Sequence, residues 1–224
     1  MVIPKVYLAS NSPRRRELLD QIGVRFDVLD ISIPEDQLAS ESPADYVQRL
    51  SIEKAAAGKK QLLQNDVKTQ KKSLSDWQST KKHATIDVVI GSDTAVVCEG
   101  EILGKPQSPE HARQMLRMLS GRTHEVFTGV AINSSRSSSD GDFEILSAIS
   151  RNLVTFRQIS EQEIERYIAT NEGHDKAGGY AIQGLAVIFI EQLQGSYSAV
   201  MGLPLFETAE LLKQAGVEVL PVLT

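Results

Sequence analysis

The sequence predicts an α/β fold built on a mixed, twisted sheet flanked by helices. Apolar runs typical of strands alternate with segments of helical periodicity along the whole chain. This alternation lacks the strict strand–helix–strand rhythm that an all-parallel sheet requires. Residues 122–132 and 144–156 are rich in Val, Ile, Thr and Phe, and a serine-rich loop at 134–142 joins them. Two such segments predict an antiparallel hairpin with a long tip.

The N-terminal elements place three arginines at the start of a helix. Residues 6–9 form a short apolar run typical of a strand, Ser12 fits a helix N-cap, and Pro13 fits the first helical position. Residues 14–16 are all arginine. The free N–H groups and the dipole of a helix start attract anions, so this spot suits a phosphate chain. Solvated surface arginines are the alternative.

A second strand, a second helix and a polar insertion follow. Residues 26–33 predict a strand, and Ser42-Pro43 predicts a helix start. Lys54 comes four residues after Leu50, near the buried edge of that helix, so its side chain could point into a cleft. Residues 58–86 are lysine-rich and aperiodic, which indicates a helix extension and then a mobile surface excursion. A solvated insertion is favoured there over an arm that contacts nucleic acid.

The middle of the chain predicts an interrupted strand and a third helix. Residues 87–90 form a buried strand that Gly91–Thr94 interrupts, and residues 95–98 continue it or pair with it. A turn then leads to a short return strand at 102–103. Ser108-Pro109 repeats the pattern of an N-cap followed by a first-turn proline.

The C-terminal third predicts two helices around a glycine-rich segment. Ser160 and Glu163 have the spacing of a capping box, which predicts a helix start. Residues 171–184 are polar and glycine-rich, and residues 186–190 are typical of a strand. The last helix is expected to bury one face, formed by Leu205, Ala209 and Leu212.

Composition limits the class of protein. The 224 residues suffice for one large domain or two lobes, with 41% hydrophobic and 24% charged residues. The formal net charge of −5 argues against a broad nucleic-acid footprint. Cys98 is the only cysteine, which excludes an internal disulfide and argues against a cysteine-based metal site. The apolar stretch at 185–190 is far too short to span a bilayer, so we expect a cytoplasmic protein without membrane contact.

Acidic and basic residues near the predicted strand ends could perform chemistry. Asp93 lies where the central strand is expected to break, and its carboxylate could act as a general base or hold a divalent cation. Glu35 or Asp36, in the loop after the second strand, could join it around Mg²⁺. Lys54 and Lys105 could neutralise phosphate charge. The alternatives are a turn aspartate, an exposed acidic loop and surface lysines. No nucleotide-binding P-loop or dinucleotide fingerprint has the required spacing.

Six segments together resemble the Maf family, in order and over nearly the whole chain. They are Leu8–Arg15 (LASNSPRR), Ser92-Asp93-Thr94, Gly104-Lys105-Pro106, Leu119-Ser120-Gly121, Asp175–Gly184 (DKAGGYAIQG) and Gly202-Leu203-Pro204-Leu205. The resemblance implies a fold similar to that of inosine triphosphate pyrophosphatases, with a cleft between two lobes, and commonly a homodimer. It also implies hydrolysis of nucleoside triphosphates to the monophosphate and pyrophosphate with a divalent metal.

The resemblance assigns roles to individual positions. Asp93 matches the family's proton acceptor, and Arg14, Thr94 and Gln183 match positions that matter for substrate choice. Further positions match other cleft residues, namely Ser10, Arg15, Glu35, Lys54, Lys105 and Asp175. The triplet Ile182-Gln183-Gly184 looks like the branch acting on dTTP and UTP, because the branch acting on 7-methyl-GTP typically has Ser-Glu-Gly there.

The sequence therefore predicts one Maf-like domain over residues 1–224, made of two lobes, with a surface insertion at about 58–86. The expected activity is a pyrophosphatase that acts on dTTP, UTP and modified pyrimidine nucleotides, with Mg²⁺ or Mn²⁺ held by Glu35 and Asp93. The expected role is removal of non-canonical nucleotides, and nucleic acid is not expected as a partner. The alternative is a nucleotide-sensing or nucleic-acid-binding regulator, linked to cell division and without turnover.

Overall fold

A single mixed sheet organises the part of the chain that the computed structural model describes, residues 4–72, 87–134 and 144–220, with the backbone alone at 66–72. The strand order is β2-β1-β3-β5-β6-β7, and β4 pairs with β3. The β2–β1 and β1–β3 pairs are parallel and all other pairs are antiparallel. The predicted mixed sheet is confirmed. Its strands are β1 (Lys5–Leu8), β2 (Phe26–Val28), β3 (Asp87–Cys98), β4 (Glu101–Leu103), β5 (Thr123–Ser134), β6 (Glu144–Phe156) and β7 (Ile190–Gln194).

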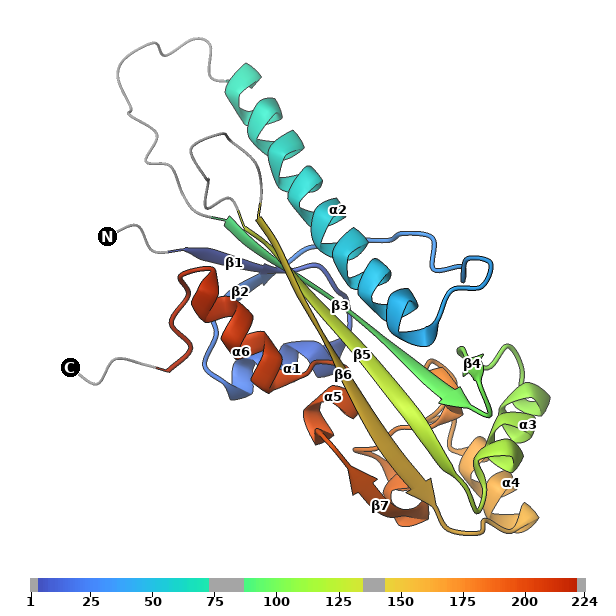
Figure 1. Cartoon of the computed structure of the whole chain (residues 1–224). Coiled ribbons are helices and arrows are strands. Elements are labelled where there is room, and N and C mark those ends of the chain that lie inside the picture. Colours follow the sequence, from blue (N-terminus) through green and yellow to red (C-terminus); the bar gives the residue numbers. More distant parts are fainter. Residues whose placement is uncertain (1–3, 73–86, 135–143, 221–224) are drawn as a thin grey trace.

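Helices cover both faces of this sheet and one of its ends. The long α2 crosses one face over β3 and β5, while α1, α5 and α6 lie on the other face, and α3 and α4 pack together at the end (Figure 1). The helices are α1 (Pro13–Gln21), α2 (Pro43–Lys72), α3 (Pro109–Leu119), α4 (Glu161–Ala169), α5 (Tyr197–Met201) and α6 (Leu205–Gln214), with 3-10 turns η1 (Ala177–Gly179) and η2 (Leu185–Phe189). Within the described ranges, no helix is both long and apolar enough to cross a membrane.

Local signals located the helix starts correctly. Helices α1, α2 and α3 each begin at the proline that the sequence indicated. Ser108 accepts a hydrogen bond from the His111 backbone at 3.1 Å, and the capping box of Ser160 and Glu163 is complete. The cap at α1 differs from the expectation. The Ser12 side chain makes no capping bond, and its backbone N–H donates to Ser10 Oγ at 3.2 Å.

The expected break in the central strand is wrong. Strand β3 runs without interruption, because β5 pairs with it continuously from Val88 opposite Ser134 to Val97 opposite Glu125. A glycine, a serine and an aspartate have low strand propensity, but the ladder with β5 supplies their backbone hydrogen bonds. Tertiary pairing therefore overrides the local signal.

Two other strand predictions are corrected, one in extent and one in type. The second strand stops at Val28, since its neighbour β1 ends at Leu8. The Leu29 N–H still donates to the Leu8 carbonyl oxygen at 2.9 Å, but residues 30–33 pair with none of the described strands. Residues 185–189 form the 3-10 turn η2, in which Ala186 and Phe189 are buried three positions apart, and strand β7 starts only at Ile190.

The last helix and the insertion are predicted in part. In α6, Leu212 is buried as expected, but Leu205 and Ala209 are half-buried, and Thr208 and Leu211 complete the buried face. Helix α2 continues to Lys72, so the expected helix extension is confirmed. The rest of the expected excursion, residues 73–86, and the tip of the predicted hairpin at 135–143 lie outside the described residues.

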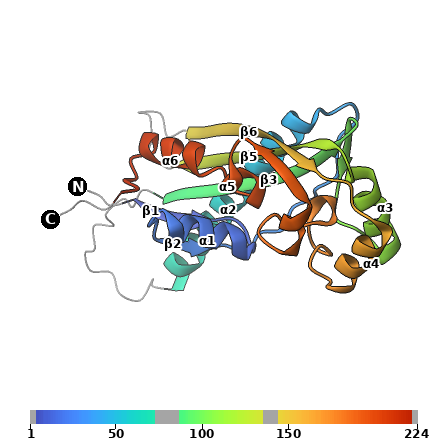
Figure 2. The same ribbon diagram turned by 90° about the horizontal axis from the view of Figure 1, so that it is seen from below.

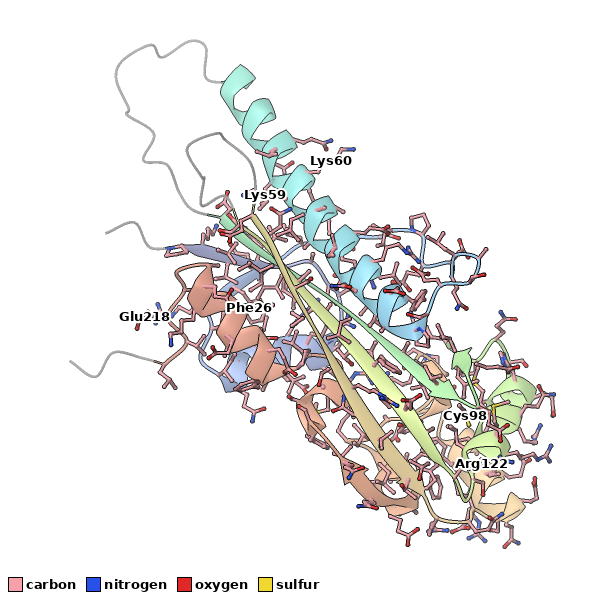
Figure 3. All side chains as sticks on the ribbon, in the orientation of Figure 1. Phe26, Lys59, Lys60, Cys98, Arg122 and Glu218 are labelled. Carbon is pink, nitrogen blue, oxygen red and sulfur yellow. The ribbon has the colours of Figure 1, made fainter. Side chains whose placement is uncertain are left out.

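Two apolar clusters lie at opposite ends of the sheet. One, with Leu8, Leu19 and Leu212, joins α1 and α6 to the start of β3. The other, with Leu116 and Phe156, joins α3 and α4 to the end of β3, and Figure 2 shows these two groups of helices apart. Figure 3 labels residues at both ends, Lys59 beside the start of β3 and Cys98 with Arg122 near α3.

Candidate active site

A cavity of about 800 Å³ opens where β1 ends and α1 begins. Its other walls come from α2, from the middle of β3 and from the loops that follow β4 and α4. All ten residues that the sequence predicted for the site line this cavity. They are Ser10, Arg14, Arg15, Glu35, Lys54, Asp93, Thr94, Lys105, Asp175 and Gln183.

The sheet leaves a gap that exposes the middle of β3 to this cavity. The ladder with β1 stops at Leu8 opposite Ile90, and β4 joins only at Val96. On that edge, the part of β3 that holds Asp93 has no neighbouring strand among the described residues. Asp93 is therefore an in-strand residue at an unpaired edge rather than a residue at a strand break. Successive side chains point to opposite faces, so Asp93 faces Lys54 of α2 while Thr94 faces Gly202 at the end of α5.

Asp93 and Glu35 converge on one lysine ammonium. Lys54 Nζ lies 2.5 Å from Asp93 Oδ1 and 2.6 Å from Glu35 Oε1. The side chains of Lys54 and Asp93 are 11% and 10% exposed, and that of Glu35 is 45% exposed. Burial by itself would raise the pKa of Glu35, but the hydrogen bond and charge of Lys54 and other nearby cations hold that pKa below its usual value. Glu35 is thus ionised at neutral pH.

Close packing of α2 on the sheet brings Lys54 within reach of Asp93. A Cβ at Gly91 would lie 2.2 Å from the Ser51 carbonyl oxygen and 2.6 Å from the Ala55 nitrogen. A Cβ at Gly129, on the neighbouring strand, would lie 2.4 Å from the Val47 carbonyl oxygen. The two glycines let the helix backbone approach the strands directly.

The Glu35 loop is tied to the same helix. The Tyr46 hydroxyl donates to the Glu35 carbonyl oxygen at 2.9 Å, and Arg49 donates to the Asp36 carbonyl oxygen at 3.1 Å. Burial, with the charges of Asp93 and Glu35, raises the pKa of Tyr46 to about 12. Asp36 does not line the cavity, so of the two candidate carboxylates the structure brings Glu35 to Asp93.

The start of α1 presents two arginines to the cavity. Arg15 donates from Nε to the Gly202 carbonyl oxygen at 2.8 Å and from Nη1 to Ser10 Oγ at 3.1 Å. Burial lowers the pKa of Arg15 and of Arg14 from its usual value, but a guanidinium keeps its proton at neutral pH. The charge of Asp175 opposes this lowering at Arg14. Two fixed positive charges therefore meet the free N–H groups of a helix start, which suits a polyanion.

The far wall comes from the segment after α4. Asp175 forms an ion pair with Lys176, and Gln183 is exposed in a turn before η2. Behind them the Tyr180 hydroxyl lies 2.8 Å from His124 Nε2 in the core. Burial lowers the pKa of His124 to about 4 and raises that of Tyr180, so both are uncharged at neutral pH. The ten predicted side chains, which include charges of both signs, thus line one cavity.

The two carboxylates suit a divalent cation only if other oxygens complete its ligand set. Among the described residues, no group of three or more His, Cys, Asp or Glu side chains could hold a metal ion. Glu35 and Asp93 nevertheless place two oxygens around a single cation, the Lys54 ammonium. Mg²⁺ is typically held by one or two carboxylates together with phosphate oxygens and water. The donor set fits an ion shared with phosphates rather than one held by protein alone.

Some lining residues were missed by sequence reasoning. Tyr46 lies four and eight residues before Leu50 and Lys54, so all three share one face of the helix. This shared face could have indicated that Tyr46 lines the cavity with Lys54. Lys176 follows Asp175 directly in the glycine-rich segment. Tyr180 was also part of that segment, but nothing local indicates that it faces the cavity.

The fold and the cavity define an α/β protein equipped to bind a polyanion beside paired carboxylates. The family model described as Maf-like protein matches residues 5–215, and the chain belongs to this family. The dTTP/UTP pyrophosphatase of Alkalilimnicola ehrlichii is 48% identical, over 94% of this chain and 93% of its own length. That of Nitrosospira multiformis is 44% identical, over 96% of each chain. A crystal structure of the nucleoside-triphosphatase / dITP/XTP pyrophosphatase of Mycobacterium abscessus aligns over 95% of this chain and 94% of its own, with 12% identity and a TM-score of 0.37.

Proposed function

We propose that this chain hydrolyses dTTP and UTP between the α- and β-phosphates, giving the nucleoside monophosphate and pyrophosphate. One observation supports this above all: the arginines at the start of α1 and the Glu35–Lys54–Asp93 group line the same cavity. The names of the two relatives, 48% and 44% identical over nearly the full length, support the choice of substrate. Removal of non-canonical pyrimidine nucleotides is the physiological role we propose.

The cationic residues would hold the phosphate chain. Arg14 and Arg15, together with the N–H groups at the start of α1, would bind the phosphate oxygens. Ser10 holds the Arg15 guanidinium in place, and Asp175 lies close enough to raise the pKa of Arg14. Lys105 would offset the charge that develops on the leaving pyrophosphate.

Asp93 would act as the proton acceptor. The oxygen of an attacking water forms a bond to phosphorus, and the bond to the oxygen that bridges the α- and β-phosphates breaks. The bridging oxygen leaves with pyrophosphate, and the water proton goes to the Asp93 carboxylate. Lys54, 2.5 Å from this carboxylate, keeps it oriented toward the cavity.

Glu35 and Asp93 are the residues that would hold Mg²⁺ or Mn²⁺. When bound, such an ion neutralises phosphate charge and orients the phosphate oxygens. Calorimetric titration of the protein with Mg²⁺ or Mn²⁺ tests this assignment when it is carried out both with and without pyrophosphate. The ion should bind weakly alone and at least about tenfold more tightly with pyrophosphate.

Gln183 and Thr94 would contribute to the choice of base. The Gln183 amide offers both a donor and an acceptor, as recognition of a pyrimidine edge requires. A pocket that hydrogen-bonds one base rejects bases that leave its polar groups unpaired. Thr94 Oγ1 lies 3.1 Å from Thr128 Oγ1, which fixes it to the neighbouring strand.

We also propose that the protein is a cytoplasmic homodimer in which the two ends of the sheet form two lobes of one domain. The two separate apolar clusters support the lobes, and the single cysteine suits a reducing compartment. Light scattering coupled to size-exclusion chromatography tests the dimer.

A panel of canonical and modified nucleoside triphosphates tests the activity directly. Monophosphate and pyrophosphate are quantified for each nucleotide. Equal amounts of dTMP and pyrophosphate from dTTP, with slower turnover of purine nucleotides, are expected. Release of inorganic phosphate with a diphosphate product would contradict the proposed bond cleavage, and binding without turnover would favour a regulator.

A further inference from the structure

We propose that Tyr167 and Glu172 form a clamp that positions Gln183 and thereby sets the choice of base. This inference rests on the proposed function, and neither residue lines the cavity itself. Gln183 lies in a turn closed by a 3.0 Å hydrogen bond from the Gly184 N–H to the Ala181 carbonyl oxygen. The Gln183 side chain is exposed and makes no hydrogen bond to another described residue, so the backbone of this turn sets the direction in which it leaves the chain.

The clamp holds the turn from both sides. Before the turn, the Ala181 N–H donates to the Tyr167 hydroxyl at 3.2 Å. After it, the Leu185 N–H donates to Glu172 Oε2 at 2.9 Å, and the Ala186 N–H lies 3.4 Å from Oε1. The two clamp residues are joined, because the Tyr167 hydroxyl donates to Glu172 Oε1 at 2.9 Å.

The clamp is itself rigidly placed. Tyr167 is 5% exposed and packs edge-on against Phe189, with ring centroids 5.5 Å apart. Burial and the hydrogen bond to Glu172 raise the pKa of Tyr167, so its hydroxyl keeps the proton that it donates. A Cβ at Gly184 would lie 2.3 Å from the Glu172 carboxylate, so the carboxylate fills the space beside the turn.

Removing the clamp should loosen the base site and leave the phosphate site intact. Tyr167→Phe deletes the hydroxyl but keeps the ring. Glu172→Gln replaces one of the two acceptor oxygens by an NH₂ group, so the side chain can no longer accept from both the Tyr167 hydroxyl and the Leu185 N–H. For either variant we expect the ratio of kcat/KM for dTTP to that for GTP to fall about tenfold. The loss should appear in KM for dTTP, with kcat within about threefold and inhibition by pyrophosphate within about twofold.

Two controls separate positioning from general destabilisation. Ser160→Ala weakens the start of the same helix, α4, by removing its capping box, and should lower stability without changing the dTTP-to-GTP ratio. In a Gln183→Ala background, Tyr167→Phe should have no further effect on the ratio, because the side chain that the clamp positions is absent.

The outcomes are distinguishable. Wild-type protein that releases no pyrophosphate from dTTP would contradict the proposed function. An active Tyr167→Phe and an active Glu172→Gln that both keep the wild-type ratio would overturn the clamp alone. The clamp would also be overturned if Ser160→Ala lowered the dTTP-to-GTP ratio, or if Tyr167→Phe lowered it further in the Gln183→Ala background.

Discussion

At the residue scale, Lys54 joins the two candidate carboxylates. A buried ammonium is stable only with charged or polar partners, and Lys54 has two carboxylates within 2.6 Å. The same contacts keep Asp93 and Glu35 from repelling each other. In the sequence Lys54 is one of many lysines, and its spacing from Leu50 and its match to a cleft position of the family set it apart.

Lys54→Met tests this role. The two carboxylates would lose the ammonium that they share, and no positive charge at this position would stabilise the leaving pyrophosphate. We therefore expect kcat to fall at least about 100-fold. Lys60→Met, at an exposed position on the same helix, is the matched control and should keep wild-type turnover. Turnover within about threefold of wild type in Lys54→Met would contradict the role.

His124 predicts how stability depends on pH. Its folded pKa of about 4 lies below the usual 6.5 because of burial, so the unfolded chain binds more protons between these values. Stability from this group is complete above pH 6.5 and is lost as the pH falls toward 4. From pH 7 to 5 the free energy of unfolding should drop by about 2 kcal/mol more in wild type than in His124→Gln. Chemical denaturation at both pH values measures the free energy of unfolding. Equal decreases in wild type and His124→Gln would refute the low pKa of His124.

At the scale of elements, local chemistry determined where helices begin, and tertiary pairing determined how far strands extend. The prolines at 13, 43 and 109 act on their own turns, so the sequence suffices to locate those helix starts. The continuity of β3 depends on β5, more than thirty residues away, and was mispredicted for that reason. Gly91 suggested a break, whereas the structure shows that it makes room for α2.

Gly91→Ala tests the contact between α2 and the sheet. The added Cβ would meet backbone atoms of α2 at 2.2 and 2.6 Å, which no side-chain rotation can relieve. We expect a loss of about 3 kcal/mol in the free energy of unfolding. Because Lys54 is displaced from Asp93, we also expect kcat to fall roughly 10- to 100-fold. Gly104→Ala, where a Cβ meets nothing within 4 Å, is the control for stability and should change it by less than about 0.5 kcal/mol. Wild-type stability in Gly91→Ala would contradict the close packing.

At the scale of the whole molecule, the cavity gathers residues from segments that lie far apart in the chain. Residue chemistry alone could suggest Asp93, Lys54 and the arginines of α1 as candidates, but it could not show that they lie in one site. Their grouping was predicted from the resemblance of the motifs, in their order, to the Maf family. The structure brings all ten residues to one cavity. Tyr180 could not be selected beforehand, since only the packing of the core brings it there, whereas Tyr46 shares a helix face with Leu50 and Lys54.

The most direct test of the central claim compares Asp93→Asn with wild type by quantifying dTMP and pyrophosphate from dTTP. Asparagine keeps the shape of the side chain but cannot accept the water proton, so we expect turnover to fall at least about 1000-fold. Affinity for dTTP should change by no more than about threefold, and Asp36→Asn, whose side chain is outside the cavity, should turn over normally. Asp93→Asn that releases pyrophosphate at the wild-type rate would contradict the account.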